Sequence, residues 1–144
     1  MTSDFRALVE TLAQHRVEYV LIGGVALVLH GSARTTQDLD ICYSREVRNL
    51  EALADALAGI HPYLRGAPPG LPFHLDVGAL RSGLNFTLQT DAGDLDLLGE
   101  VTGVGTYRDL IRDATPMELY GHTVMVMGLD SLERAKRAAG RLKD

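Results

Sequence analysis

The chain of 144 residues has a single cysteine, no long apolar run and fewer basic than acidic residues. Cys42 alone cannot form an internal disulfide, which is typical of proteins from a reducing compartment. The longest apolar run, residues 25–29, is too short to cross a bilayer, and the N-terminus lacks the apolar stretch of a signal peptide. We therefore expect a soluble, cytoplasmic protein without a membrane partner.

The charge balance is 14 basic against 19 acidic residues, which gives a net charge of −5. Proteins that coat nucleic acid through bulk charge carry the opposite sign, so this class is disfavoured. A nucleic-acid substrate held locally or through metal ions stays compatible with the composition. Apolar residues make up 46% of the chain, and no linker, repeat or low-complexity tract divides it. We expect one domain spanning residues 1–144.

Hydrophobic periodicity predicts an alternation of helices and strands. Helices are expected at residues 4–14, 25–30, 45–58, 106–113 and 131–139, and strands at residues 17–22, 38–43, 84–89, 94–98, 117–120 and 123–127. The proline-rich segment 61–72 is predicted to be a loop, and residues 75–80 fit a short helix or irregular chain. This order predicts an α/β or α+β fold, with a mixed β-sheet flanked by helices in a single domain.

Gly23 and Gly24 lie between the first predicted strand and a short apolar helix. Glycine permits positive φ and close approach, and amides at a helix start can face an anion, so the pair is a candidate phosphate site. A tight strand-to-helix turn without a ligand explains the same residues. Arg34 follows in a polar loop, where it can contact phosphate or brace the loop through a carboxylate.

Asp38 and Asp40 alternate with Leu39 and Ile41 in a predicted strand, so both carboxylates project from one face. Adjacent carboxylates repel each other unless a cation lies between them, and Mg²⁺ prefers one or two carboxylates together with phosphate oxygens. The alternative is an exposed acidic strand face.

A second strand repeats the pattern with Asp94 and Asp96. Asp94 adjoins a turn and is expected to be solvated there. Asp96 lies deeper in the strand, where an unpaired charge is costly. Asp96 is therefore the candidate third ligand beside Asp38 and Asp40, in a site that could hold two Mg²⁺ ions.

The sequence resembles the polymerase-β-like nucleotidyltransferase superfamily in a combination of four motifs. They are Leu-Ile-Gly-Gly-x-Ala, His-Gly, Arg34-x-Thr36 and Asp38-Leu-Asp40-Ile. More narrowly, the sequence is similar to the small bacterial branch related to the AbiEii-type toxins of toxin–antitoxin systems. The third acid of that branch precedes a leucine pair, as Asp96 does here, and the C-terminal segment 136–144 also resembles it. Relatives continue into another helix where this chain ends, so acceptor recognition and activity stay open.

The resemblance implies a nucleotidyltransferase-like fold and the transfer of a nucleoside monophosphate from a nucleoside triphosphate to the hydroxyl of a tRNA or protein. It implies Mg²⁺, or Mn²⁺ in its place, as the cofactor and a cognate antitoxin as a partner. The implied catalytic residues and metal ligands are Asp38, Asp40 and Asp96. The implied nucleotide-binding residues are Gly23, Gly24, Arg34 and Lys136.

Two other functions fit the same residues. A non-catalytic module of this fold could bind a nucleotide or serve as one half of a toxin–antitoxin pair, which the acidic charge and the chain end favour. A structural α/β domain with merely exposed acids would instead have Asp96 far from Asp38 and Asp40.

Overall fold

The computed structural model describes residues 4–31 and 37–143, with side chains up to residue 140. The strands are β1 (Tyr19–Ile22), β2 (Asp38–Tyr43), β3 (Tyr63–Leu64), β4 (Phe86–Thr90), β5 (Gly93–Leu98), β6 (Glu100–Val101), β7 (Gly105–Thr106), β8 (Thr115–Leu119) and β9 (His122–Val126). The helices are α1 (Phe5–Gln14), α2 (Gly23–Leu29), α3 (Val47–Ala58), α4 (Val77–Ser82), α5 (Tyr107–Leu110) and α6 (Leu129–Lys143).

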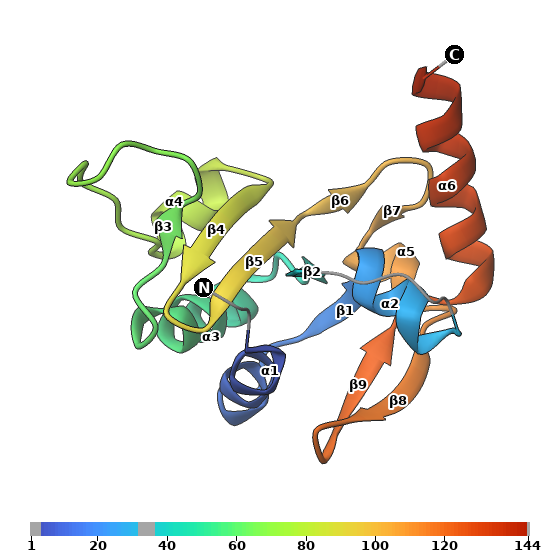
Figure 1. Cartoon of the computed structure of the whole chain (residues 1–144), viewed down its shortest axis with the longest axis horizontal. Coiled ribbons are helices and arrows are strands. Elements are labelled where there is room, and N and C mark those ends of the chain that lie inside the picture. The colour runs from blue at the N-terminus through green and yellow to red at the C-terminus, as the bar shows by residue number, and fades with distance from the viewer. Residues whose placement is uncertain (1–3, 32–36, 144) are drawn as a thin grey trace.

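The main sheet of the described residues has seven strands in the order β3-β4-β5-β2-β1-β9-β8. β2 pairs with β5 in parallel and with β1 in antiparallel orientation, and β1 pairs in parallel with β9. The sheet is therefore mixed, as the sequence predicts. The short strands β6 and β7 form a separate hairpin beyond β5 (Figure 1).

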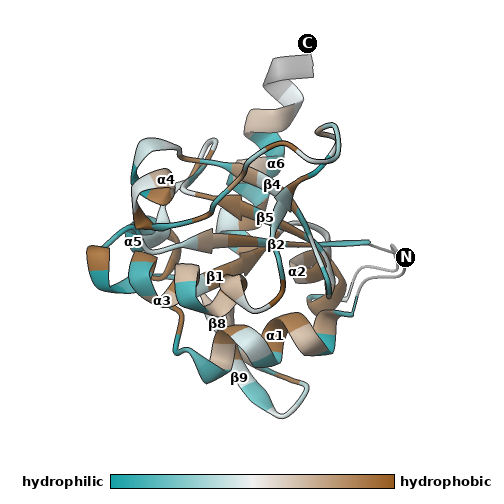
Figure 2. Cartoon of the chain, turned by 90° about the vertical axis from the view of Figure 1, so that its left-hand side faces the viewer, coloured by the Kyte–Doolittle hydropathy of each residue, from teal (hydrophilic) through white to brown (hydrophobic). Residues whose placement is uncertain are grey.

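The core follows from the alternation within the central strands. Leu39 and Ile41 of β2 and Leu95 and Leu97 of β5 are fully buried, because alternate residues of a strand face opposite sides. Figure 2 shows hydrophobic residues running through these central strands. The aspartates between these leucines and isoleucines must then lie on the other face.

The helices cover this core with amphipathic faces. α1 buries Leu8, Val9 and Leu12, and its first turn is capped by Asp4, whose carboxylate accepts a hydrogen bond from the Ala7 amide at 3.0 Å. α1 contacts α3, and α3 contacts α4, so these helices lie side by side (Figure 1). α6 stands apart from them, with its C-terminal turns extending past the sheet in Figure 1.

Several element boundaries differ from the sequence prediction. The segment 61–72 contains β3, which pairs with β4, and the β6–β7 hairpin was not predicted. Of the two conformations predicted for residues 75–80, the structure shows the helix: α4 begins at Val77 and is capped by Asp76. α5 is shorter and α6 longer than predicted. None of the helices in the described residues is both long and apolar enough to traverse a membrane.

Candidate active site

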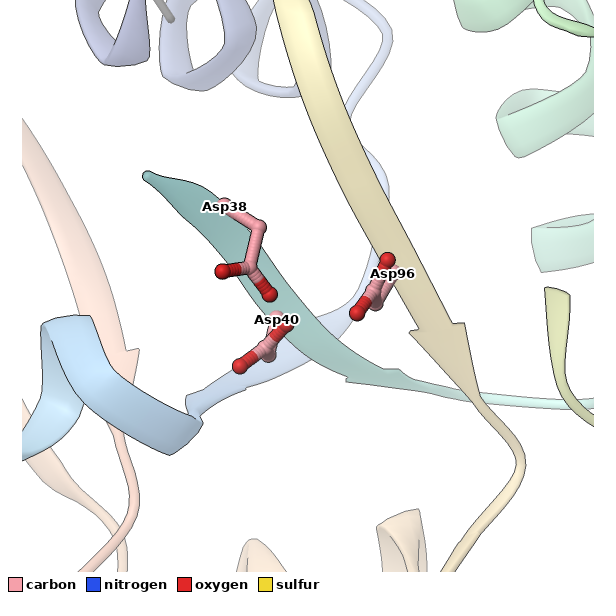
Figure 3. Close-up of side chains that lie close together, drawn as sticks. All are labelled: Asp38, Asp40 and Asp96. Atoms are coloured by element: carbon pink, nitrogen blue, oxygen red, sulfur yellow. The ribbon is translucent and has the colours of Figure 1, made fainter. Parts of the chain in front are cut away.

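The three predicted metal ligands come together on one face of the sheet. β2 and β5 pair in register, with Asp40 opposite Asp96. One carboxylate oxygen from each of Asp38, Asp40 and Asp96 lies within 4.8 Å of the others. Figure 3 shows the three side chains close together, Asp38 and Asp40 on one strand and Asp96 on the neighbouring strand. Asp96 is thus close to Asp38 and Asp40, contrary to what a structural domain with scattered acids requires.

The proximity of the carboxylates separates their pKa values. Burial raises the pKa of Asp40 to about 8, and the neighbouring Asp38 and Asp96 reinforce the effect. The pKa of Asp38 is lowered, chiefly by its hydrogen bond with Asp40. Burial raises the pKa of Asp96, while the guanidinium of Arg65 opposes this change. Without a cation, Asp40 therefore holds a proton at neutral pH.

A divalent cation fits this set of donors. All three ligands offer carboxylate oxygens, which are the donors that Mg²⁺ and Mn²⁺ prefer. Asp40 Oδ1 is buried and has no hydrogen-bond partner among the described residues. A buried acceptor without a partner is costly, and a bound cation would relieve that cost.

Gly23 keeps the space beside Asp40 open. β1 ends at Ile22, and α2 begins at Gly23 with φ +70°, in the left-handed region that favours glycine. A Cβ atom at this position would overlap the Asp40 carboxylate and lie 2.9 Å from the Asp40 Cβ. Gly24 is the next residue of α2 and is half-buried. The glycine pair thus allows the backbone to approach the carboxylates closely.

A cleft of about 950 Å³ opens beside the carboxylates. Asp40, Asp96 and Gly23 line it from the sheet side, and Lys136 lines it from α6. Glu133 of α6 also lines it, and the remaining lining is apolar, from Ile22, Leu27, Leu98, Val101, Met127, Leu129, Leu132 and Ala135. The cleft has the composition of a small-molecule site, which is mainly apolar with a few polar groups.

Arg65 is a residue of the site that the sequence analysis did not identify. It follows β3 directly, and its Nη2 donates hydrogen bonds to Asp96 Oδ1 at 2.6 Å and to the Leu88 carbonyl at 2.7 Å. Its Nε lies 3.4 Å from Asp94 Oδ2. Asp94, expected to be a solvated turn residue, is therefore part of an ion pair. The only local signal for Arg65 is its place in a predicted loop, which does not reveal these contacts.

Arg34 lies outside the described residues, so its predicted phosphate contact stays a prediction. Cys42 is fully buried on β2, and burial raises its pKa to about 12, so it remains a thiol. His30 ends α2, and its Nε2 lies 2.8 Å from the Met127 carbonyl oxygen. His30 thereby ties α2 to the segment between β9 and α6.

Comparison with known proteins identifies the fold. No protein-family model matches the sequence, and no curated protein matches it. Among solved structures, the chain is similar to the crystal structure of a "putative nucleotidyltransferase (TM1012) from Thermotoga maritima". The TM-score is 0.65 at 16% sequence identity, and the alignment covers 96% of this chain and 84% of the other. The predicted nucleotidyltransferase-like fold is thus confirmed, while the narrower resemblance to the AbiEii-type branch stays a prediction.

Proposed function

We propose that this protein is a nucleotidyltransferase that moves a nucleoside monophosphate from a nucleoside triphosphate to an acceptor hydroxyl and releases pyrophosphate. The observation that carries the proposal is the cluster of Asp38, Asp40 and Asp96 at a cleft that Lys136 also lines. The nucleotidyltransferase-like fold supports the same activity.

In this proposal, Asp38, Asp40 and Asp96 hold Mg²⁺, for which Mn²⁺ could substitute. When bound, such ions neutralise phosphate charge and lower the pKa of an attacking hydroxyl. Asp96 would accept the proton of that hydroxyl, because burial raises its pKa and so makes it a better proton acceptor, although Arg65 opposes part of that rise. Asp40 would exchange its proton for the cation, since burial and the neighbouring Asp38 and Asp96 raise its pKa to about 8.

The triphosphate would lie along the cleft between the sheet and α6. Lys136 would pair with the phosphates from the helix side, and the backbone of Gly23 and Gly24 would approach them closely. Arg34 would add a further phosphate contact. The aliphatic side chains of the cleft would contact the nucleoside and exclude water from the reacting groups.

The resemblance of the sequence to the AbiEii-type branch supports a tRNA or protein hydroxyl as the acceptor. It also supports a role as the toxin of a toxin–antitoxin system, with a cognate antitoxin as partner. The net charge of −5 favours local contacts to an RNA acceptor over attraction by the whole surface.

The proposal is tested by incubating the protein with Mg²⁺, each α-labelled nucleoside triphosphate, and candidate RNA and protein acceptors. We expect the wild type to transfer label to one acceptor and the Asp38→Ala/Asp40→Ala variant to transfer none. Asp55→Asn, which removes an exposed carboxylate from α3, should behave like the wild type. Equal labelling by the wild type and the double variant would show the proposal to be wrong.

Calorimetry with ATP, CTP, GTP and UTP separates the enzyme from the non-catalytic module. Binding of a triphosphate without pyrophosphate release, in the presence of the correct acceptor class, would identify a module of the same fold. Binding of none of the four would contradict the enzyme and a nucleotide-binding module alike.

A further inference from the structure

Arg65 is held in one position by contacts to three different groups. Its backbone amide donates to the Thr87 carbonyl at 2.9 Å, which continues the pairing of β3 with β4. Nη2 donates both of its hydrogens, one to the Leu88 carbonyl and one to Asp96 Oδ1. The guanidinium therefore has little freedom to rotate, although 29% of the side chain is exposed.

Asp96 lies between Arg65 and Asp40. One of its oxygens accepts the hydrogen bond from Arg65, and the carboxyl group is also hydrogen-bonded to Asp40. Thr87 of β4 pairs with Asp96 of β5, which pairs in turn with Asp40 of β2. The contacts thus follow one line across four strands, from the edge of the sheet to the centre of the carboxylate cluster.

We infer that Arg65 is a positioning residue that fixes Asp96, so that one carboxylate oxygen stays bound to the guanidinium and the other remains available to a metal ion. This inference rests on the proposed function, because it assigns Asp96 to the metal site. Arg65 itself contacts neither the cleft nor the predicted nucleotide-binding residues in any described contact. Its effect on the site passes through Asp96.

An arginine suits this role better than a lysine. The guanidinium offers several donors in a fixed plane, so one side chain can hydrogen-bond both Asp96 and the Leu88 carbonyl while its Nε stays 3.4 Å from Asp94 Oδ2. An ammonium group at the same position would preserve the charge but not the geometry. The comparison of Arg65→Lys with Arg65→Gln therefore separates the loss of orientation from the loss of charge.

The test titrates the nucleotide-free protein with Mn²⁺, followed by electron paramagnetic resonance, so that it does not depend on turnover. Loss of orientation should weaken Mn²⁺ binding about tenfold in Arg65→Gln, the lower end of the range typical of residues that orient metal ligands, and about threefold in Arg65→Lys, which keeps the positive charge. If Arg65 acted only as a repelling positive charge, Arg65→Gln would bind Mn²⁺ more tightly. Equal or tighter binding in Arg65→Gln would overturn the inference, and so would wild-type binding in Arg65→Lys.

Arg108 provides the matched control. Its Nη2 lies 3.1 Å from Glu46 Oε1, and both side chains are largely exposed. Arg108→Gln makes the same chemical change in a more exposed arginine–carboxylate pair outside the carboxylate cluster and should leave Mn²⁺ binding unchanged. Circular dichroism verifies that each variant is folded, and if Arg65→Gln does not fold, Arg65→Lys decides the outcome by the threefold criterion.

A kinetic measurement adds a second criterion. Arg65→Gln should lower kcat about tenfold or more and leave KM for the triphosphate within about twofold, because it misplaces Asp96 without touching the nucleotide. A raised KM with unchanged kcat would contradict the positioning role. If the wild type itself shows no turnover, the proposed function fails, while the Mn²⁺ titration still decides the role of Arg65.

Discussion

The tripeptide Asp-Leu-Asp occurs twice in the site, at residues 38–40 of β2 and at residues 94–96 of β5, and the copies pair residue by residue. Their partners differ. In β5, both carboxylates contact Arg65. In β2, the hydrogen-bond partners of Asp40 within the described chain are the carboxyl groups of Asp38 and Asp96.

This difference shows that the same tripeptide, placed in two paired strands, has different electrostatic properties because the surrounding residues differ. The protein supplies a positive charge to the β5 copy and none that contacts Asp40 among the described residues. Asp40 responds by retaining a proton, with a pKa of about 8. The β2 copy is therefore where a bound cation would gain most, and the predictions below perturb one copy and use the other as reference.

The largest expected difference concerns activity. Asp40→Asn removes a proposed metal ligand and should lower kcat/KM about a thousandfold, since metal stabilisation of the transition state is worth several kcal/mol. Asp94→Asn makes the same chemical change in the other copy but leaves the bond between Arg65 and Asp96 in place, so we expect less than about a threefold loss. Pyrophosphate release measures both, and similar losses in the two variants would abolish the distinction between the copies.

A methyl group at position 23 would overlap Asp40, which belongs to the β2 copy. Gly23→Ala should destabilise the fold by about 3 kcal/mol, because it combines positive φ with overlap against Asp40. Gly121→Ala is the matched control: Gly121 has φ +81°, and no described atom lies within 4 Å of its Cβ position. We expect about 1 kcal/mol for that variant. Urea denaturation measures both, and equal costs would mean that contact with Asp40 is unimportant.

The pH dependence of stability should reveal the raised pKa of Asp40 in the β2 copy. The pKa of Asp40 rises from 3.8 to about 8 on folding, so its contribution to stability is complete below about pH 4 and is lost as the pH rises to about 8. Asp40→Asn cannot ionise and escapes this loss. In metal-free buffer its Tm should gain roughly 5 °C over the wild type between about pH 5 and pH 8. Thermal denaturation with EDTA measures this change, and a difference in Tm that does not vary with pH would contradict the raised pKa of Asp40.

The smallest expected effect is the release of a proton when metal binds. A cation at Asp40 should displace about one proton per molecule at pH 7, because the group is mostly protonated there and ligands bind metal in the ionised form. Calorimetric titration with Mn²⁺ in two buffers of different ionisation enthalpy measures that proton. Asp40→Asn should release none, and a wild type that also releases none would contradict the raised pKa.

Much of the site is predictable from sequence because local alternation encodes it. β2 spans the residues that alternation predicts, and the same period brings Asp38 and Asp40 to one face. The alternation of Asp94 and Asp96 with buried leucines works in the same way in β5. The strands predicted at residues 84–89 and 94–98 are confirmed as β4 and β5, which pair in antiparallel orientation.

Arg65 escapes prediction for a physical reason. It bonds to Asp96, 31 residues away, and this contact depends on a two-residue strand at the edge of the sheet. A strand of that length has no measurable periodicity, and nearby prolines favour a loop. The packing of Gly23 against Asp40 is equally non-local, because it depends on how β1 pairs with β2. Contacts that form only when the sheet assembles cannot be predicted from a short stretch of sequence.

The division of the cleft between sheet and helix has an evolutionary consequence. Lys136, Leu129, Leu132 and Ala135 all belong to the single helix α6, whereas the three aspartates belong to β2 and β5. Substitutions in one contiguous stretch of fifteen residues can therefore reshape what the cleft accepts and leave the carboxylate geometry unchanged. Such an arrangement allows substrate preference to diversify, in nature or by helix grafting, independently of the reaction chemistry.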